Sequence, residues 1–361
     1  MTYSSWSIMV DDPNGLFHEG EVQRRDVGPD DVKISIEFCG ICHSDLHQVS
    51  GDWPGSIFPM VPGHEIVGVI EEVGSAAAQN FAVGQRVGVG CFVGSCGQCD
   101  ACRSGHEQFC EKGQISTYNA MDYEGNPTYG GYSRSMTVDS RYVIRIPDAL
   151  DSAHAAPLLC AGVTLFAPME RWGVEEGTTL AVIGMGGIGH IGVQMGQSRG
   201  ANVTVIGRTE SKKADAMRFG ASRFLTVDQL RADPKLQGSF DVILNTTAGS
   251  NDVDLYLSLL AVDGVYVPLG LGDEQLSFAP SSLFWNNRVI AGSLIGGVGL
   301  NQKSISYCAA EGIAPQIEIV PGTAEAVNDA YARLKRSDVR YRFVIDMRAP
   351  SPDATAEYPE N

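Results

Sequence analysis

The sequence predicts an α/β protein in which a mainly β domain accompanies a domain built on a doubly wound parallel sheet. One observation is length, because 361 residues exceed the roughly 250 to 300 at which a single hydrophobic core stops growing. Another is a series of short β-type runs, broken by Gly and Pro, over about the first 150 residues. From about residue 151, apolar runs alternate with helical stretches, which is typical of βαβ units.

Composition narrows the classes of function. Hydrophobic residues make up 43% of the chain and charged residues 19%, a balance that excludes a disordered or fibrous protein. The net charge of -17 makes nucleic acid and anionic membranes poor partners. The uncharged stretch 177–198 contains seven glycines, so we do not expect it to span a membrane. The first residues lack a basic stretch, and a cytoplasmic location is expected.

The expected strands of the mainly β part are short runs separated by Gly and Pro. They lie at 32–38, 65–72, 86–89, 135–138 and 142–146. In the second part the expected strands are apolar runs, with helical stretches such as 214–219 between them. These strands lie at 179–183, 202–206, 241–244 and 265–269. The alternation fades near residue 289, and 339–347 is a further expected strand that we place back in the first domain.

Four cysteines, Cys96, Cys99, Cys102 and Cys110, form a C-x2-C-x2-C-x7-C pattern in a Gly-rich segment. Four thiolates on one loop can surround Zn2+ tetrahedrally with no open position, which indicates a structural site. Iron–sulfur ligation is the alternative, because bacterial ferredoxins share C-x2-C-x2-C, but their fourth cysteine follows after three residues and precedes Pro. Cys110 follows after seven residues and precedes Glu111, so zinc is favoured.

Ligand-type residues also occur outside this lobe, in CHSDLH at 42–47, in GHE at 63–65, and at Cys160. A catalytic zinc needs three protein ligands and one open position, and two cysteines with one histidine form a known set. Each residue alone fits ordinary packing, but their joint presence favours a second metal site. Cys39, Cys91 and Cys308 lie in apolar or helical surroundings, and we expect them in the core.

The expected strand 179–183 leads into GMGGIGH, residues 184–190, and a helical stretch follows. A G-x-G-x-x-G pattern between a strand and a helix predicts a dinucleotide site, because the backbone can approach the pyrophosphate at a helix N-terminus. A structural glycine turn is the alternative. The expected cofactor-binding glycines are Gly184, Gly186, Gly187 and Gly189.

The end of the next expected strand indicates which dinucleotide binds. NAD enzymes usually carry a carboxylate there for the ribose 2′-hydroxyl. This chain reads VIGRTESKK over 205–213, with Glu210 beyond the strand end. A solvated basic helix start is one interpretation, and recognition of the 2′-phosphate of NADP(H) is the favoured one. The residues that could bind this phosphate are Arg208, Thr209, Ser211 and Lys212.

Six motifs together resemble the zinc-dependent medium-chain alcohol dehydrogenases. They are CGICHSDLH, VPGHEIVGVI, the four-cysteine lobe, LLCAGVT, GMGGIGH and DVRYRFVID. The resemblance spans nearly the whole chain and is greatest to the cinnamyl alcohol dehydrogenase group, including bacterial NADPH-dependent aldehyde reductases. It implies that Cys42, His64 and Cys160 ligate a catalytic zinc, so that two zinc ions are expected per chain.

The same resemblance assigns four further residues around the catalytic zinc. It implies that Glu65 is a neighbouring or transient ligand and that Asp45 orients His64. In the proton relay of this family, Ser44 matches the hydroxyl group and His47 matches the outer imidazole.

The resemblance also implies a domain organisation. A GroES-like catalytic domain is expected over 1–152 and 291–361, with the structural zinc lobe at about 91–112 and a Rossmann domain over 153–290. Relatives imply a homodimer or homotetramer.

Three further side chains have roles by resemblance. Trp53 and Phe92 fall at positions that line the substrate pocket, although aromatic residues in such segments are as often core. His43 falls where some relatives contact the cofactor phosphates.

The expected activity is hydride transfer between NADP(H) and primary alcohols or aldehydes, with aromatic or allylic substrates favoured. Zinc lowers the pKa of a bound alcohol, and the proton would leave through Ser44 and the His47 imidazole. An NADP(H) preference indicates aldehyde reduction as the usual direction. The alternative is a catalytically silent zinc- and nucleotide-binding redox sensor or structural protein. Loss of a ligand would mark that class, and all three expected ligands are present.

Overall fold

Two sheets of different kinds organise the chain, and each belongs to a separate unit. The computed structural model describes residues 2–249, 252–270, 272 and 275–348. One unit comprises Met1–Cys160 with Gly296–Asn361, and the other comprises Ala161–Ile295. The mainly β first unit and the parallel sheet of the second confirm the predicted fold class. The domain limits predicted at 152 and 291 lie near these boundaries and stay predictions.

A seven-stranded sheet forms the centre of the first unit, in the order β16-β17-β3-β4-β5-β9 with β8 paired to β3. Two small two-stranded sheets, β1-β2 and β6-β7, complete its strands. The strands are β1 Thr2–Met9, β2 His18–Arg25, β3 Asp31–Ile41, β4 Ile66–Val73, β5 Arg86–Val89, β6 Phe92–Gly94, β7 Ile115–Ser116, β8 Ser135–Asp139, β9 Val143–Arg145, β16 Ile317–Pro321 and β17 Arg342–Asp346. The helices are α1 His43–Ser50, α2 Asp100–Arg103, α3 Ser152–Pro157, α10 Val298–Glu311 and α11 Ala324–Lys335.

Strand β3 is the central element of this sheet, because it pairs with β4, β8 and β17. Its apolar residues Val32, Ile34 and Ile36 are at most 2% exposed, which explains the predicted run at 32–38. The strand continues to Ile41, beyond the predicted end, because its last residues pair with β17. It therefore delivers Cys42 to the start of α1.

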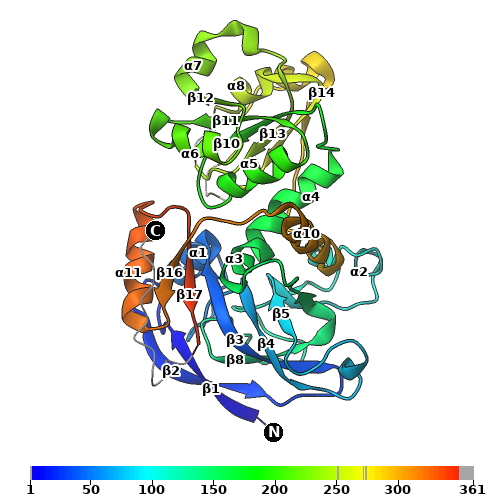
Figure 1. The fold of residues 1–361 in the computed structure, drawn as a ribbon, viewed down its shortest axis with the longest axis vertical. Helices are drawn as coiled ribbons and strands as arrows, with labels where there is room; N and C mark the ends of the chain where they lie inside the picture. Colours follow the sequence, from blue (N-terminus) through cyan, green and yellow to red (C-terminus); the bar gives the residue numbers. More distant parts are fainter. Residues whose placement is uncertain (1, 250–251, 271, 273–274, 349–361) are drawn as a thin grey trace. The chain divides into compact units, whose positions relative to one another are not determined.

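The C-terminal segment returns to the first unit. The red strand β17 lies beside the blue strand β3 in Figure 1, with Phe343 opposite Ile41. At the start of β17, Arg342 donates hydrogen bonds to both carboxylate oxygens of Glu65, the residue before β4. The Arg342 and Glu65 side chains are 5% and 0% exposed. A buried ion pair therefore joins the end of the chain to the β3-β4 region.

Strands β1 and β2 were not predicted, and the charged sequence of β2 is the main reason. The two strands pair with each other, β1 also bridges Ser133, and β2 carries the sequence HEGEVQRR with most residues exposed or half-buried. Such a ribbon lacks the apolar alternation that marks a strand packed on a core. Helices α10 and α11 also lie where the sequence pattern gave no assignment.

The second unit is an all-parallel six-stranded sheet in the order β12-β11-β10-β13-β14-β15. Its strands are β10 Thr179–Ile183, β11 Asn202–Gly207, β12 Arg223–Thr226, β13 Phe240–Asn245, β14 Leu260–Pro268 and β15 Val289–Ile290. Its helices are α4 Val163–Arg171, α5 Gly189–Ser198, α6 Lys213–Arg218, α7 Val227–Ala232, α8 Val253–Ser258 and α9 Ser281–Phe284. If β10 to β15 are counted from one to six, the strand order is 3-2-1-4-5-6, which is the arrangement of dinucleotide-binding sheets. The order reverses between β10 and β13.

One helical segment, Ser152–Arg171, is long and apolar enough to cross a membrane by length and composition. However, 83% of its apolar window is buried inside the protein, as in the core helix of a globular domain. The uncharged stretch 177–198, which was not expected to span a membrane, forms β10, the glycine loop and α5.

Candidate functional site

Two thiols, an imidazole and a carboxylate form a cluster in the first unit. The ligand atoms of Cys42, His64, Glu65 and Cys160 all lie within 4.8 Å of one another. Three distant segments supply them: the N-cap of α1, the turn before β4 and the π-helical turn Leu158–Gly162. Cys42 and His64 are only 7% and 5% exposed. The structure therefore brings together the ligand set that the resemblance implied.

Asp45 holds two members of this cluster in place. Its Oδ1 lies 3.0 Å from His64 Nδ1, and its Oδ2 accepts the backbone N–H of Cys42 at 2.8 Å. Burial opposes the charged imidazole, but the Asp45 carboxylate raises the pKa of His64 well above its ordinary value. With Nδ1 bonded to Asp45, a metal ion would replace the proton at Nε2. The predicted Asp45–His64 contact is present, and its effect on metal binding stays a prediction.

The two thiols of the cluster differ in acidity. A hydrogen bond from Cys160 lowers the pKa of the Cys42 thiol well below its ordinary value, and the same bond raises the pKa of Cys160. Cys42 is therefore the more acidic of the two thiols. Because metal ligands must be deprotonated, a zinc ion held by both thiols would displace any proton that they carry.

Glu65 lies in the cluster, but its carboxylate is already engaged. Burial raises the pKa of Glu65, and the charge of Arg342, which binds both carboxylate oxygens, opposes that rise. Sequence analysis gave Arg342 no role, although it lies in the DVRYRFVID motif. Only the fold shows that this motif faces the turn before β4.

Cys91, which was expected in the core, lies beside the cluster instead. Its side chain is half-buried, and its proximity raises the pKa of the Cys160 thiol. The prediction was wrong because apolar neighbours in sequence do not show which way a side chain faces at a strand end. Cys39 and Cys308 are fully buried, as expected.

The two predicted relay groups lie on one helix. Ser44 and His47 occupy α1 three residues apart, so both side chains lie on the same helix face. The Ser44 hydroxyl lies 3.6 Å from Cys42 Sγ, next to the cluster. His47 Nδ1 lies 3.0 Å from the carboxylate of Asp52, and the His47 ring stacks on Trp53 at 5.2 Å. Their roles in proton transfer stay predictions.

The residues assigned to substrate and phosphate contacts have different surroundings. Trp53 is half-buried and covers the His47 ring, so it lies beside the predicted relay. Phe92 is 6% exposed and packs edge-on against Tyr142 at 5.9 Å. Packing explains its bulk, and a contact with substrate stays a prediction. His43 is exposed at the start of α1.

The four-cysteine lobe closes on itself in the first unit. The ligand atoms of its four cysteines lie within 4.8 Å of one another, and Cys102 Sγ lies 3.4 Å from Cys99 Sγ and 3.9 Å from Cys96 Sγ. Tetrahedral zinc with Zn–S bonds of about 2.3 Å separates its sulfurs by about 3.8 Å. Backbone N–H groups of Gln98 and Cys99 point at Cys96 Sγ and lower its pKa. The donor set and its spacing fit zinc.

The glycine loop of the second unit follows β10 at the point where the strand order reverses. Gly184 has φ +90°, and a Cβ atom at Gly189 would lie 2.1 Å from the carbonyl oxygen of Gly184. No residue other than glycine fits this turn. Helix α5 begins at Gly189, so its N-terminal amides can face a pyrophosphate.

Two threonines lie where the strand order of the sheet reverses, and the sequence was not used to predict a role for them. Thr246 and Thr247 follow β13, and Thr246 Oγ1 donates to the carbonyl of Ile183 at 2.8 Å. The sequence could have indicated these two threonines. Dinucleotides bind beside the carboxyl ends of the strands where the strand order reverses, and both threonines follow such a strand.

The end of β11 gathers the predicted 2′-phosphate residues. The hydroxyls of Thr209 and Ser211 lie 3.0 Å apart, and Arg208 is exposed. Lys212 donates to the carbonyl of Met185 in the glycine loop at 2.8 Å, so its ammonium joins the strand end to the loop.

The acidic residue of this segment has other partners. Glu210 lies 3.2 Å from Lys213 Nζ and accepts from Gln229 at 3.5 Å. Its carboxylate is therefore engaged by residues outside the predicted phosphate set.

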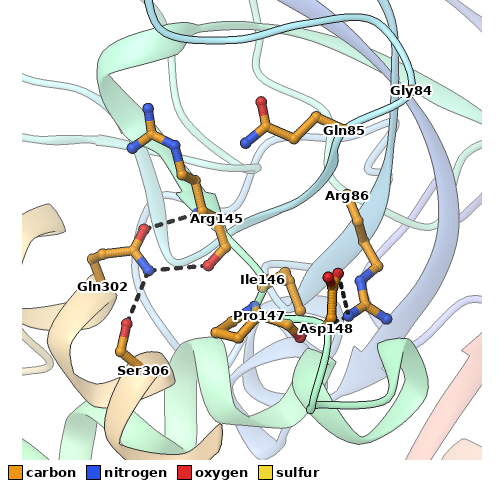
Figure 2. Close-up of a pocket in the computed structure, with 9 residues that line it drawn as sticks. All are labelled: Gly84, Gln85, Arg86, Arg145, Ile146, Pro147, Asp148, Gln302 and Ser306. Atoms are coloured by element: carbon orange, nitrogen blue, oxygen red, sulfur yellow. Dashed lines mark hydrogen bonds and ion pairs between the residues drawn. The ribbon is translucent and has the colours of Figure 1, made fainter.

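A separate hollow in the first unit has different chemistry. Figure 2 shows Gln302 bonded to both backbone groups of Arg145, and Arg86 bonded to the carbonyl of Pro147 and near Asp148. These hydrogen bonds and this ion pair join the polar groups of the hollow to one another. None of the predicted site residues lines this hollow.

Two family models match the chain, "Alcohol dehydrogenase GroES-like domain" over residues 28–148 and "Zinc-binding dehydrogenase" over 187–310. The "probable formaldehyde dehydrogenase" of Bacillus subtilis is 47% identical over 340 residues, covering 94% of this chain and 97% of that protein. "NADP-dependent alcohol dehydrogenase C 1" of Mycolicibacterium smegmatis is 47% identical over 326 residues, covering 90% and 93%. A solved cinnamyl alcohol dehydrogenase structure from Sorghum bicolor has a TM-score of 0.92 and 35% identity, covering 98% and 100%.

We expect each chain to bind two zinc ions, measured by elemental analysis of washed protein. Cys102→Ser should leave one ion and lower the melting temperature, because a structural zinc contributes folding energy directly. Cys160→Ser should also leave one ion but melt close to the wild type. One ion in the wild type, or iron in place of zinc, would contradict the assignment of the two sites.

Proposed function

The chain belongs to the zinc-binding alcohol dehydrogenases, and from this premise we propose that it interconverts primary alcohols and aldehydes with NADP(H). The observation that carries the proposal is the cluster of Cys42, His64 and Cys160, in a chain that also holds the glycine loop. Two thiols and one imidazole leave a tetrahedral zinc one open position, which is the arrangement of a catalytic site. A silent sensor or structural protein has no need of that open position.

The side chains around the cluster support a division of roles. When bound, zinc supplies a Lewis acid that polarises the substrate oxygen. Asp45 fixes the tautomer of His64, and Ser44 stands next to Cys42 to exchange a proton with the substrate hydroxyl. His47 then passes the proton towards solvent, with its ring oriented by Asp52. Glu65 remains beside the ligand set, because Arg342 holds its carboxylate.

NADP(H) is the proposed cofactor because positive charge and hydroxyls meet at the end of β11. Arg208 is exposed there, and the Lys212 ammonium reaches the glycine loop. Glu210 is turned to Lys213 and Gln229, so it competes little for a ribose hydroxyl. The relative named as NADP-dependent supports the same choice. An NADP(H) preference favours aldehyde reduction as the usual direction.

Aromatic or allylic substrates are proposed because the relay histidine lies under an aromatic ring. Trp53 stacks on His47, which offers a flat apolar surface next to the proton path. The cinnamyl alcohol dehydrogenase with a TM-score of 0.92 supports this class. The alternative substrate is a small aldehyde, which the relative named as a probable formaldehyde dehydrogenase supports.

A homo-oligomer in the cytoplasm is the proposed state. In the second unit, Phe284 and Trp285 are 78% and 73% exposed, and Val262 of β14 is 68% exposed. These residues lie near β15, the edge strand of the parallel sheet, and an exposed apolar edge favours pairing with another copy. None of the nine cysteines, all of which lie within the described residues, forms a disulfide, which suits a reducing compartment.

The first test is turnover of cinnamaldehyde and formaldehyde with NADPH, followed at the cofactor absorbance. We expect a higher kcat/KM for cinnamaldehyde. Cys160→Ser should lower kcat/KM at least about 1,000-fold, because a Lewis acid contributes several kcal/mol to the transition state. Cys308→Ser, a buried thiol outside the cluster, is the control and should retain activity. Wild-type protein inactive with every aldehyde would contradict the proposal.

The second test replaces the exposed arginine at the end of β11. Arg208→Asp should lower kcat/KM for NADPH about 10- to 100-fold, since a charge-assisted contact contributes about 1.5 to 3 kcal/mol. Activity with NADH should stay equal or rise. Lys235→Asp makes the same charge change at another exposed site of the unit and should not alter the ratio. A wild-type preference for NADH would refute phosphate recognition here.

The third test concerns assembly and measures mass in solution by light scattering. Trp285→Glu should shift the wild-type oligomer towards smaller species, because it places a charge on the proposed apolar edge. Leu16→Glu alters a residue of the first unit that is 79% exposed and should leave the mass unchanged. A monomeric wild type would rule out the proposed assembly.

A further inference from the structure

We propose that Tyr118 is a positioning residue for the zinc-binding imidazole of His64, acting on the tilt of its ring. The inference rests on the proposed function, because it assigns a role within the same zinc site. Sequence analysis gave Tyr118 no role, and it lies 54 positions from His64 in the chain.

Tyr118 packs against the cluster through its ring. The ring stacks on His64 with centroids 5.9 Å apart and planes 24° from parallel. Tyr118 is 6% exposed, so the contact is buried from water.

The backbone on both sides of Tyr118 is held. On one side, the N–H and hydroxyl of Thr117 donate to the carbonyls of Cys91 and Gly90. On the other, the Asn119 side chain accepts from the N–H of Ile57 at 2.6 Å and donates to Gln48 of α1. Asn119 has φ +56°, a conformation that asparagine tolerates better than most residues. The ring of Tyr118 is thus presented from a fixed backbone.

Stacking and hydrogen bonding restrain different rotations of His64. A metal ion binds the imidazole lone pair in the plane of the ring, so the direction of Nε2 depends on both the tilt of the ring and its rotation within the plane. The Asp45 bond restrains the in-plane rotation, and the parallel Tyr118 ring restrains the tilt. Groups that orient a metal-bound histidine typically change metal affinity 10- to 100-fold when they are removed.

The test compares Tyr118→Leu, which loses the stacked ring, with Tyr118→Phe, which keeps the ring and loses only the hydroxyl. Zinc affinity of the Cys42, His64 and Cys160 set is measured by competition with a chelator, and the site is also loaded with Co2+ to record its visible spectrum. We expect about 10-fold weaker zinc binding and a shifted cobalt spectrum for Tyr118→Leu, and wild-type values for Tyr118→Phe. Asn119→Gly, which frees the backbone anchor, should give a smaller loss than Tyr118→Leu.

Tyr132→Phe is the matched control. Tyr132 is 0% exposed, and its hydroxyl meets the neutral hydroxyl of Tyr331 at 3.1 Å. It should lower the melting temperature without changing zinc affinity or the cobalt spectrum. Equal loss of affinity in Tyr132→Phe, or a Tyr118→Leu protein that binds zinc like the wild type, overturns the positioning role alone. A wild type with no zinc at this set overturns the proposed function as well.

Discussion

Two carboxylates that have no access to water, Asp45 and Glu65, govern how the first unit is built. Each is 0% exposed, and an unpaired charge in that position would cost several kcal/mol. Asp45 is bonded to His64 and to the start of α1, whereas Glu65 is bonded to Arg342 of the last strand. Satisfying both charges draws the end of β3, the turn before β4 and the C-terminal strand to one place. The predicted zinc ligands lie where these segments meet.

The second unit depends on a steric constraint rather than on charge. Its glycine loop closes so tightly that a Cβ atom at Gly189 would overlap the carbonyl of Gly184. That closeness starts α5 directly after the glycine loop, so that the N-terminus of the helix can face a pyrophosphate. Lys212 then connects the end of β11 to the same loop through the carbonyl of Met185. One short segment thus serves both the pyrophosphate and the predicted 2′-phosphate residues.

The sequence determined those features whose physics is local. The four-cysteine lobe is contained in fifteen residues, 96–110, so its spacing alone indicates a closed tetrahedral set. The glycine pattern, the apolar strands of the parallel sheet and the absence of a carboxylate at the end of β11 are local in the same sense. The roles of Cys42, His64 and Cys160 came from a resemblance, because no local rule joins residues more than a hundred positions apart.

Tertiary structure decided which distant groups share one environment. Cys91 lies in an apolar stretch that predicts core, yet the fold leaves it half-buried and close enough to Cys160 to raise the pKa of that thiol. Arg342 and Tyr118 lie far in sequence from the residues that they contact, and only the pairing of β17 with β3 and the held backbone at 117–119 bring them to Glu65 and His64. The strands β1 and β2 form by pairing with each other, and a bridge from Ser7 to Ser133 joins β1 to the rest of the unit. In each case the deciding free energy comes from burial and pairing between segments, which no single segment encodes.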